Sequence, residues 1–506
     1  MTFVRVLSYA IQGIDAVPVA VEVDVSPGLP GFEVVGLPDA AVREARERVR
    51  AAIRNGGWSF PMQRITVNLA PAYTRKEGAG FDLAMALGVL GAAGQFDPAL
   101  LGRFVVAGEL ALDGALRPVR GALAMALATR KLSGELVLIL PPESALEATA
   151  VGAPVLVAGQ LAEIVDHLTG RTPLSPPQPE PEREPSGASP LDLAVVRGQA
   201  VARRALEVAA AGGHNLMMIG PPGAGKSLLA RCLPTILPPL GPEEALEVSR
   251  IHSVAGMLSG GRLMRHRPFR SPHHSASRSA LLGGGKPIRP GEVTLAHRGV
   301  LFLDELPEFR RDVLEGLRQP LEDGSVSLAR VHGNLAFPSR PMLVAAANPC
   351  PCGYFGNESR PCTCPSAAIT HYRARLSGPL LDRFDLQLFL DPVTYEEYRA
   401  TDQAESSAVV RRRVERARQV QANRLAGTGV SCNAELSPAQ VRRYCRLPVG
   451  GEQLMRNAME RLGLSLRGHD RVLKMARTIA DLVGADQIEL PHLAEALQYR
   501  GINERI

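Results

Sequence analysis

The chain has 506 residues, of which 45% are hydrophobic, and a net charge of +6 at neutral pH. This length allows two or three domains with substantial cores, and the small charge excess is weak support for a polyanionic partner. There is no run of eighteen apolar residues and no recognisable signal peptide, so we expect a cytoplasmic protein without a membrane partner. The seven cysteines, an odd number, argue against a disulfide framework.

Residues 1–168 form the first block of the chain. Two of its stretches, "TRKEGAGFDLAMALGVLGAAG" and "VVAGELALDGALRPVRGALAMALA", resemble the proteolytic domain of the Lon protease, an α+β domain. A Ser–Lys peptidase needs a hydroxyl beside an amine that accepts its proton. Aligning the residue types places these two positions on Gly80 and on about Leu123, and neither residue can do that chemistry. We therefore predict a proteolytically inactive, Lon-protease-like scaffold or docking module.

The next blocks differ in their patterning. Residues 169–190 include "RTPLSPPQPEPEREPSGASP", whose seven prolines predict an extended spacer. Residues 191–394 alternate apolar runs with glycine turns, which is typical of buried parallel strands joined by helices. In residues 395–506 helical spacing replaces these runs, as in "VLKMARTIADLVGA". We expect an α/β fold in which a central parallel sheet is followed by a helical C-terminal domain.

A phosphate-binding loop opens the central block. Residues 220–227, "GPPGAGKS", match G-x-x-x-x-G-K-[ST] between an apolar run and a helix-compatible segment. Backbone N–H groups of such a loop surround phosphates, Lys226 reaches the terminal phosphates, and Ser227 offers a hydroxyl to magnesium. An ordinary glycine turn is the alternative. The predicted ATP-binding residues are Gly220, Pro221, Pro222, Gly223, Ala224, Gly225, Lys226 and Ser227.

Polar residues at the ends of later strands complete a hydrolytic site. "GVLFLDE" ends in Asp304, which would hold magnesium with Ser227, and in Glu305, which would polarise the attacking water. "MLVAAAN" ends in Asn348, which could position the same water. "SGPLLDRFD" places Arg383 after a short helix, where it could serve as an arginine finger. Solvated carboxylates and a solvated arginine are the alternatives.

The order of these motifs identifies a family. "HHSASRSALLGGGKPIRPGEVTLAHRGVLFLDE", "AAANPCPCG" and "SGPLLDRFD", after the phosphate-binding loop, resemble the magnesium-chelatase-like AAA+ ATPases of the bacterial ComM/YifB type over nearly the whole chain. The resemblance implies that Asn348 is sensor 1 and that Arg383 acts on a neighbouring subunit's nucleotide, hence a homo-oligomeric ring, expected to be a hexamer. It places sensor 2 in "SLRGHDRVLKMARTIADL", at Arg467 with Arg471 as runner-up, and the adenine beside residues 192–199.

A basic segment lies between the phosphate-binding loop and Asp304. Residues 250–299 hold nine Lys or Arg residues and one acid, Glu292. In the resembled family this region forms insertions that reach toward the pore of the ring. Cations that neutralise phosphates bind DNA without reading its sequence, and we take Lys286 and Arg289 as candidate DNA contacts. A basic surface that faces a neighbouring subunit's nucleotide or its acidic edge is the alternative.

Four cysteines cluster directly after Asn348. Cys350, Cys352, Cys362 and Cys364 have the spacing C-x-C-x9-C-x-C, and four thiolates can close a tetrahedral zinc site. Because four protein ligands leave no position for water, a zinc ion here would be structural. Buried unpaired thiols are the alternative.

Two functions remain open from the sequence. The first is an ATP- and Mg²⁺-dependent ring motor acting on single-stranded or branched DNA. The resemblance implies a helicase that promotes branch migration of recombination intermediates during natural transformation. The second is a protein-remodelling ATPase that drives a partner protein, as the magnesium chelatases do. The Lon-protease-like domain and the cysteine cluster favour the first.

Overall fold

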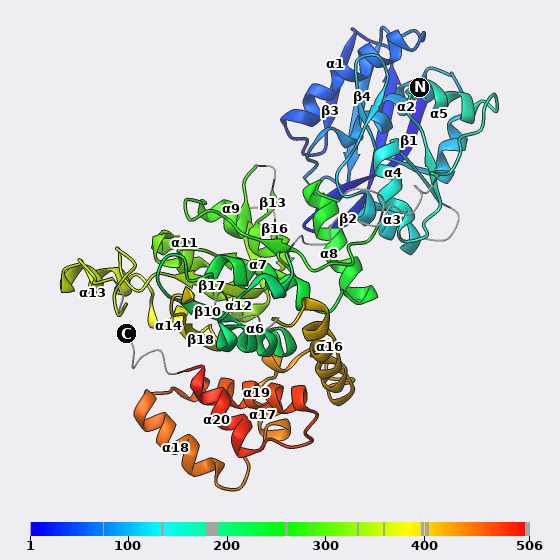
Figure 1. Cartoon of the computed structure of the whole chain (residues 1–506). Helices are drawn as coiled ribbons and strands as arrows, with labels where there is room; N and C mark the ends of the chain where they lie inside the picture. The colour runs from blue at the N-terminus through cyan, green and yellow to red at the C-terminus, as the bar shows by residue number, and fades with distance from the viewer. Residues whose placement is uncertain are drawn as a thin grey trace.

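Figure 1 shows the computed structural model of the chain, coloured from its N-terminus to its C-terminus. The structure describes residues 2–73, 75–132, 136–178, 191–258, 262–286, 288–330, 333–357, 360–395, 399 and 404–500. An N-terminal domain, a central domain and a set of C-terminal helices follow one another along the molecule (Figure 1).

The N-terminal domain is built on a mixed sheet. Among the described residues its strand order is β3-β4-β2-β1-β5-β8-β9. The strands are β1 (Thr2–Gln12), β2 (Asp15–Ser26), β3 (Gly31–Val35), β4 (Arg64–Ala70), β5 (Phe104–Val106), β8 (Val137–Leu140) and β9 (Val155–Val157). A small ribbon pairs β6 (Glu109–Leu110) with β7 (Leu116–Arg117). The helices are α1 (Ala40–Asn55), α2 (Asp82–Ala92), α3 (Ala122–Lys131), α4 (Pro142–Thr149) and α5 (Leu161–Leu168).

Alternating valines explain the core of this domain. In β2, Val19, Val21, Val23 and Val25 are buried at every second position, as expected of a strand with one face on a core. Helix α2 is apolar and buried on all sides because it lies in that core. It approaches β2 closely at Gly88, where a Cβ atom would stand 2.4 Å from Cγ2 of Val23. Leu123, one of the two positions aligned with the peptidase pair, is fully buried in α3.

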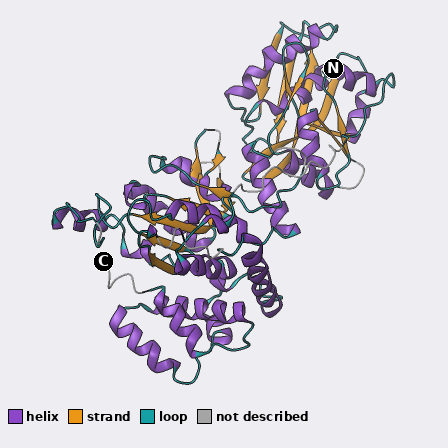
Figure 2. Ribbon diagram, in the orientation of Figure 1, coloured by secondary structure: helices purple, strands orange, loops and turns teal. Residues whose placement is uncertain are grey.

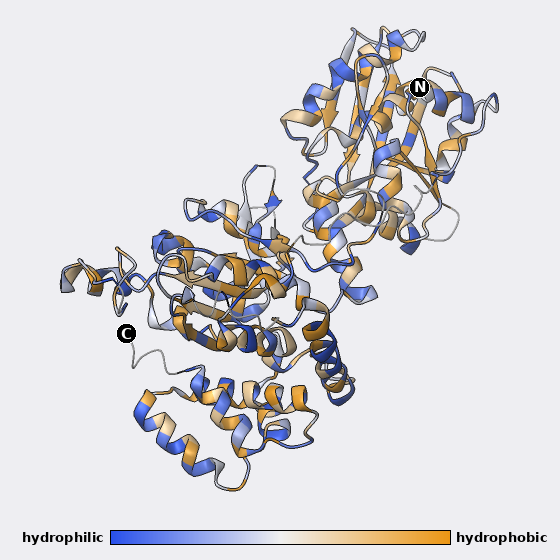
Figure 3. Ribbon diagram, in the orientation of Figure 1, coloured by the Kyte–Doolittle hydropathy of each residue, from blue (hydrophilic) through white to orange (hydrophobic). Residues whose placement is uncertain are grey.

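The central domain contains a parallel sheet in the order β11-β14-β17-β10-β18. These strands are β11 (Phe269–Arg270), β14 (Val300–Leu303), β17 (Met342–Ala347), β10 (Leu216–Ile219) and β18 (Leu386–Phe389). Leu216 and Met218 pack on one face of the sheet, whereas Met217 and Ile219 pack on the other. Helices therefore enclose both faces, and this is why the strands are continuous apolar runs (Figures 2 and 3).

Two hairpins extend from this domain: β12 (Gly283–Gly284) pairs with β13 (Arg289–Pro290), and β15 (Ser325–Arg330) pairs with β16 (Gly333–Pro338). The helices of the central domain are α6 (Ala200–Gly212), α7 (Lys226–Ile236), α8 (Pro242–Ala255), α9 (Arg278–Leu282), α10 (Glu292–Leu295), α11 (Arg311–Gly316), α12 (Arg318–Asp323), α13 (Ser366–Ala374) and α14 (Gly378–Leu381).

Helices dominate the remainder of the chain, namely α16 (Ser407–Arg424), α17 (Pro438–Tyr444), α18 (Gly451–Leu462), α19 (Leu466–Val483) and α20 (Leu490–Gln498). Helix α16 packs against α6 and α7, and α19 also packs against α6, so these helices share a core with the central sheet. The predicted α/β fold, with a parallel sheet and a helical C-terminal region, is confirmed. None of the helices in the described ranges combines the length and apolar character that crossing a membrane requires.

Part of the predicted spacer is attached to the N-terminal domain. The N–H of Val157 donates to the carbonyl oxygen of Ser175 at 3.0 Å, and the N–H of Leu174 donates to Nδ1 of His167 at 3.1 Å. The Leu174 side chain packs against the N-terminal core, whereas most of residues 171–178 are exposed. Residues 179–190 of the spacer lie outside the described residues.

The N-terminal and central domains meet where α3 begins and α8 ends. The N–H of Gly121 donates to the carbonyl oxygen of Ser253 at 3.0 Å, and the N–H of Leu123 donates to Oγ of Ser253 at 3.3 Å. The same Ser253 hydroxyl donates to Oε2 of Glu147 at 2.6 Å. Nearby, Arg250 of α8 forms an ion pair with Asp15. Burial raises the pKa of the Glu147 carboxyl from 4.5 to about 7.

This carboxyl should make stability depend on pH. Because the folded state keeps a proton that the unfolded state releases, stability should fall as pH rises from about 4.5 to about 7. Glu147→Gln keeps a carbonyl acceptor for Ser253 and removes the ionisation. We expect the variant's melting temperature, relative to wild type, to be higher at about pH 8 than at about pH 5, by roughly 1–3 °C. Calorimetry measures this difference, with Glu143→Gln on the exposed side of α4 as control. Identical pH profiles for wild type and Glu147→Gln would contradict the assignment.

Candidate nucleotide-binding site and cysteine cluster

The phosphate-binding loop connects the carboxyl end of β10 to the first turn of α7. Gly223 and Gly225 have φ values of +82° and +85°, in the left-handed region that disfavours residues with a Cβ atom. Within the described part of the chain, a Cβ atom at either glycine would meet nothing within 4 Å, so the backbone conformation, not a lack of space, requires glycine there. The loop thereby turns its N–H groups and the positive end of α7 toward a bound anion.

Lys226 lies folded over this loop. Its Nζ donates to the carbonyl oxygens of Gly220 at 2.6 Å and Pro221 at 2.9 Å, and to Oδ1 of Asn348 at 3.0 Å. Burial lowers the pKa of this ammonium group to about 8. The structure thus brings together the lysine of the loop and the residue predicted as sensor 1, although they are far apart in the sequence.

The two predicted magnesium ligands also lie together. Oγ of Ser227 donates to Oδ2 of Asp304 at 2.6 Å, directly after β14 ends. A hydroxyl and a carboxylate are oxygen ligands of the kind that Mg²⁺ prefers, so the pair fits the expected ion. Gln199, at the edge of the segment expected beside the adenine, reaches the same loop through the carbonyl oxygen of Ala224 at 3.5 Å.

Glu305 has an unusual backbone and an unexpected partner. Its φ of +50° is left-handed, which is rare for a residue other than glycine and frequent at functional sites. Oε2 of Glu305 lies 3.3 Å from Nδ1 of His274. The sequence does not predict this contact, because His274 follows a different strand, β11, and no spacing rule links the two residues. The only local signal was a pair of histidines after a short strand.

Arg383 and Arg467 lie at the opposite edge of the sheet. The carbonyl oxygen of Arg383 accepts from Nδ2 of Asn215 at 2.9 Å, and Asn215 precedes β10, whereas the phosphate-binding loop follows it. The four residues of β10 separate these edges by roughly 13 Å. Glu322 contacts both arginines, at 2.5 Å from Arg383 and 3.4 Å from Arg467. Within one chain, the structure does not bring either arginine to the phosphate-binding loop.

Both arginines line a polar crevice of about 1100 Å³ between the central domain and the C-terminal helices. Arg471, the runner-up for sensor 2, lies in the same crevice and pairs with Asp385 at 3.5 Å. Arg383 is turned inward, with only 10% of its side chain exposed. The crevice therefore concentrates the arginines that the sequence assigned to nucleotide contacts.

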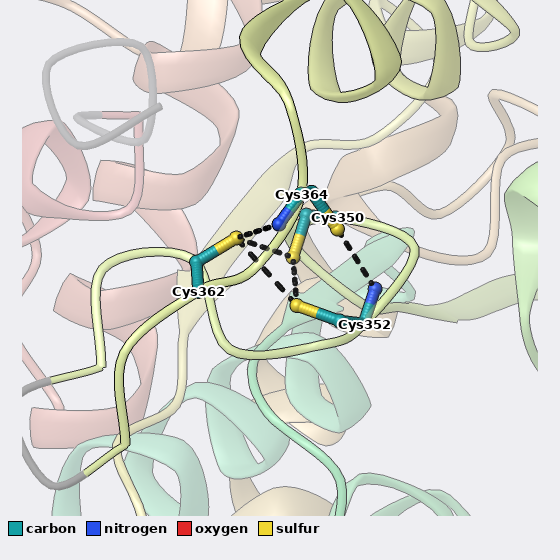
Figure 4. Close-up of side chains that lie close together, drawn as sticks. All are labelled: Cys350, Cys352, Cys362 and Cys364. Atoms are coloured by element: carbon teal, nitrogen blue, oxygen red, sulfur yellow. Dashed lines mark hydrogen bonds between the residues drawn. The ribbon is translucent and has the colours of Figure 1, made fainter.

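The four predicted zinc ligands converge in the cysteine knuckle, residues 350–364, of which 358–359 lie outside the described residues (Figure 4). Their sulfur atoms all lie within 4.8 Å of one another, and the Sγ atoms of Cys350, Cys352 and Cys362 are 3.4–3.6 Å apart. Sulfur ligands about 2.3 Å from a tetrahedral zinc ion would stand about 3.8 Å apart. The donor set therefore fits zinc with every position filled by protein.

The basic segment is partly neutralised within the chain. Four of its cations form ion pairs, Arg250 with Asp15, Arg267 with Glu244, Arg270 with Glu292, and Arg298 with Glu247 and Glu435. These four cations are therefore paired with acidic side chains of the same chain. Lys286 and Arg289, in contrast, are exposed on the β12–β13 hairpin, and β12 lies against β15 of the second hairpin.

Two substitutions separate nucleotide binding from hydrolysis. Lys226→Ala should abolish ATP binding or turnover, because the ammonium group facing the terminal phosphates is lost. Glu305→Gln should still bind ATP but should lower the turnover rate by about a hundredfold or more, the range of a lost general base. A fluorescent nucleotide and a phosphate-release assay measure the two steps. Normal turnover by Glu305→Gln would exclude Glu305 as the residue that polarises water.

Comparison with known proteins agrees with this geometry. The family model described as "Magnesium chelatase, subunit ChlI" matches residues 192–398, and two related models match residues 21–144 and 404–500. The chain is 45% identical to "Competence protein ComM" of Haemophilus influenzae, over 99% of this chain and 98% of that protein. It is 44% identical to "Uncharacterized protein YifB" of Escherichia coli, over 98% and 96% of the two chains, and 43% identical to the YifB protein of Salmonella typhimurium, over 99% and 98%. The chain therefore belongs to the ComM/YifB type of magnesium-chelatase-like AAA+ ATPases.

Proposed function

We propose that this protein is an ATP-driven ring motor that acts on DNA and promotes branch migration of recombination intermediates during natural transformation. The observation that supports a ring is the distance between two groups of ATPase residues. The phosphate-binding loop lies at one edge of the sheet, and Arg383 and Arg467 lie at the other. The name of the Haemophilus influenzae relative, a competence protein, supports the biological setting.

A second copy of the chain can bring the arginines of one subunit close to the phosphate-binding loop of another. If the crevice edge of one subunit faces the loop edge of the next, Arg383 and Arg467 approach the neighbour's nucleotide, and repeating that contact closes a ring. An arginine supplied in this way stabilises charge on the transferring phosphoryl group and accelerates hydrolysis about 10³–10⁵-fold in other ATPases and GTPases. Before a neighbouring nucleotide is bound, Glu322 pairs with both Arg383 and Arg467. We infer a hexamer from family membership.

Mixing two inactive variants tests this sharing. An Arg383→Ala subunit supplies an intact Glu305, and a Glu305→Gln subunit supplies an intact Arg383. In an equal mixture about a quarter of the interfaces should contain neither defect, so ATP hydrolysis should partly return.

The control is Arg383→Ala mixed with the double variant Arg383→Ala/Glu305→Gln, which forms no intact interface and should stay inactive. Full activity of a strictly monomeric preparation would contradict hydrolysis shared between subunits.

The exposed hairpin cations support DNA as the partner. Lys286 and Arg289 extend from the central domain beside the β15–β16 hairpin, so a ring would present several copies of both hairpins. Cations of this kind bind phosphates, release condensed counterions and give an affinity that falls steeply with salt. Because phosphate contacts position a protein without specifying bases, binding should depend little on sequence.

Removing these two cations tests the DNA contact. Lys286→Ala with Arg289→Ala should weaken DNA binding and DNA-stimulated ATP hydrolysis together, and should reduce the slope of log affinity against log salt by about 1–2. Basal hydrolysis should persist, because neither residue contacts the nucleotide motifs. Arg412→Ala with Arg416→Ala, on the exposed side of α16, removes the same charge elsewhere and serves as control.

The same measurements address the alternative, a protein-remodelling ATPase that drives a partner protein. The matched family models, all named for a magnesium chelatase subunit, favour that reading. It predicts ATP hydrolysis that is equal without DNA and with single-stranded, forked and four-way DNA at low salt. Such a result would overturn the DNA proposal and leave the ring unaffected.

Family membership implies ATP and Mg²⁺ as cofactors, with Ser227 and Asp304 placed to hold the ion. We also propose a structural zinc ion in the cysteine knuckle. Its support is the convergence of four sulfur atoms in a loop with few apolar residues of its own.

A further inference from the structure

We propose that the cysteine knuckle braces the phosphate-binding loop, so that metal ligation in the knuckle and ATP binding strengthen each other. This inference rests on the nucleotide site and the zinc site proposed above. The contact that carries it joins Gly353 of the knuckle to Pro222 of the loop. A Cβ atom on Gly353 would stand 2.6 Å from Cδ and 2.8 Å from Cγ of Pro222, so the knuckle backbone lies directly on the proline ring.

A second connection runs through Asn348. Cys350 follows Asn348 by two residues and is fully buried, so fixing its sulfur also restrains the chain at Asn348. Oδ1 of Asn348 accepts from Nζ of Lys226 at 3.0 Å. Cys350 is therefore connected to Lys226 of the phosphate-binding loop through the backbone between Cys350 and Asn348 and through the Asn348–Lys226 hydrogen bond.

Hydrogen bonds to sulfur shape the part of the knuckle that lies next to the cysteines. The N–H of Phe355 donates to Sγ of Cys350 at 3.3 Å, and the N–H of Cys352 donates to Sγ of Cys364 at 3.4 Å. From α13, Arg373 donates to the carbonyl oxygen of Pro349 at 3.3 Å and covers the ring of Phe355 at 4.5 Å. Because these two N–H groups donate to sulfur, this part of the loop is stabilised when the thiolates are gathered at one point, as a bound metal would do.

The consequence is a coupling between two ligands. When metal is bound, the knuckle backbone is fixed against Pro222, so the loop is held in the conformation that surrounds phosphates and loses less conformational freedom when ATP binds. Without metal, this fixed contact with Pro222 is lost. By thermodynamic reciprocity, a nucleotide that orders the loop must also slow the loss of metal from the knuckle.

Two glycines of the knuckle provide a matched pair of variants. Gly353 and Gly356 have φ values of +85° and +78°, so alanine costs similar backbone strain at both positions. Only the Cβ atom at position 353 would meet Pro222, because no atom of the described residues lies within 4 Å of the Cβ position at Gly356. We expect Gly353→Ala to bind a fluorescent ATP analogue about tenfold more weakly than Gly356→Ala. Elemental analysis should find about one zinc per chain in both variants.

Wild-type protein provides the reciprocal test without any substitution. Zinc release to a zinc-selective chromogenic chelator is followed in excess Mg²⁺, with and without a non-hydrolysable ATP analogue. The analogue should slow release several-fold in wild type and in Gly356→Ala, and less in Gly353→Ala. Equal ATP affinity in the two glycine variants would overturn the coupling. A zinc-release rate that is the same with and without the nucleotide would also overturn it.

The remaining outcomes distinguish a failure of this coupling from a failure of the proposed nucleotide site or zinc site. Wild-type protein that binds the ATP analogue but carries no metal would overturn the zinc site and, with it, the coupling. A wild type that retains zinc but binds no nucleotide would instead refute the nucleotide site. Cys350→Ser with Cys352→Ser should release zinc, lower the melting temperature and weaken ATP binding; unchanged ATP affinity after zinc loss would also overturn the coupling.

Discussion

All strands of the central sheet run in one direction, and most of the molecule's chemistry follows from this constraint. Parallel strands carry their carboxyl ends to a common edge, so loops that are distant in the sequence meet there. Ser227 after β10 reaches Asp304 after β14, and Lys226 reaches Asn348 after β17. Because apolar clusters cover both faces of the sheet, these contacts rest on a largely apolar base. The polar groups are thereby positioned before any nucleotide arrives.

The same constraint leaves the other edge of the sheet without a nucleotide of its own. Arg383 and Arg467 come from a loop before β18 and from the first turn of α19, and they converge on Glu322 within a crevice that the C-terminal helices help to form. In the proposed ring, each edge of the subunit supplies part of a site that a neighbouring subunit completes. Repeating the chain around an axis would complete both edges at once, and this is the physical basis for the proposal.

Contacts outside the sheet connect its edges to the rest of the chain. Helix α8 carries Ser253 to the N-terminal domain, where Gly121, Leu123 and Glu147 bind it, so that domain is attached to the segment that follows the phosphate-binding loop. The cysteine knuckle lies on the loop itself through Gly353 and Pro222.

The sequence by itself determined the features that depend on local pattern. Continuous apolar runs indicated strands buried on both faces, the glycines of 220–227 indicated a loop around phosphate, and the spacing of the four cysteines indicated that they would meet. Only the tertiary structure decided which edge holds Arg383 and Arg467, that His274 contacts Glu305, and that four cations of the basic segment form internal ion pairs. It also placed Leu174 of the proline-rich spacer against the N-terminal core. The physical reason is that periodicity and turn chemistry act over a few residues. Ion pairs and close packing instead depend on how strands and helices distant along the chain are arranged, and that arrangement exists only in the folded molecule.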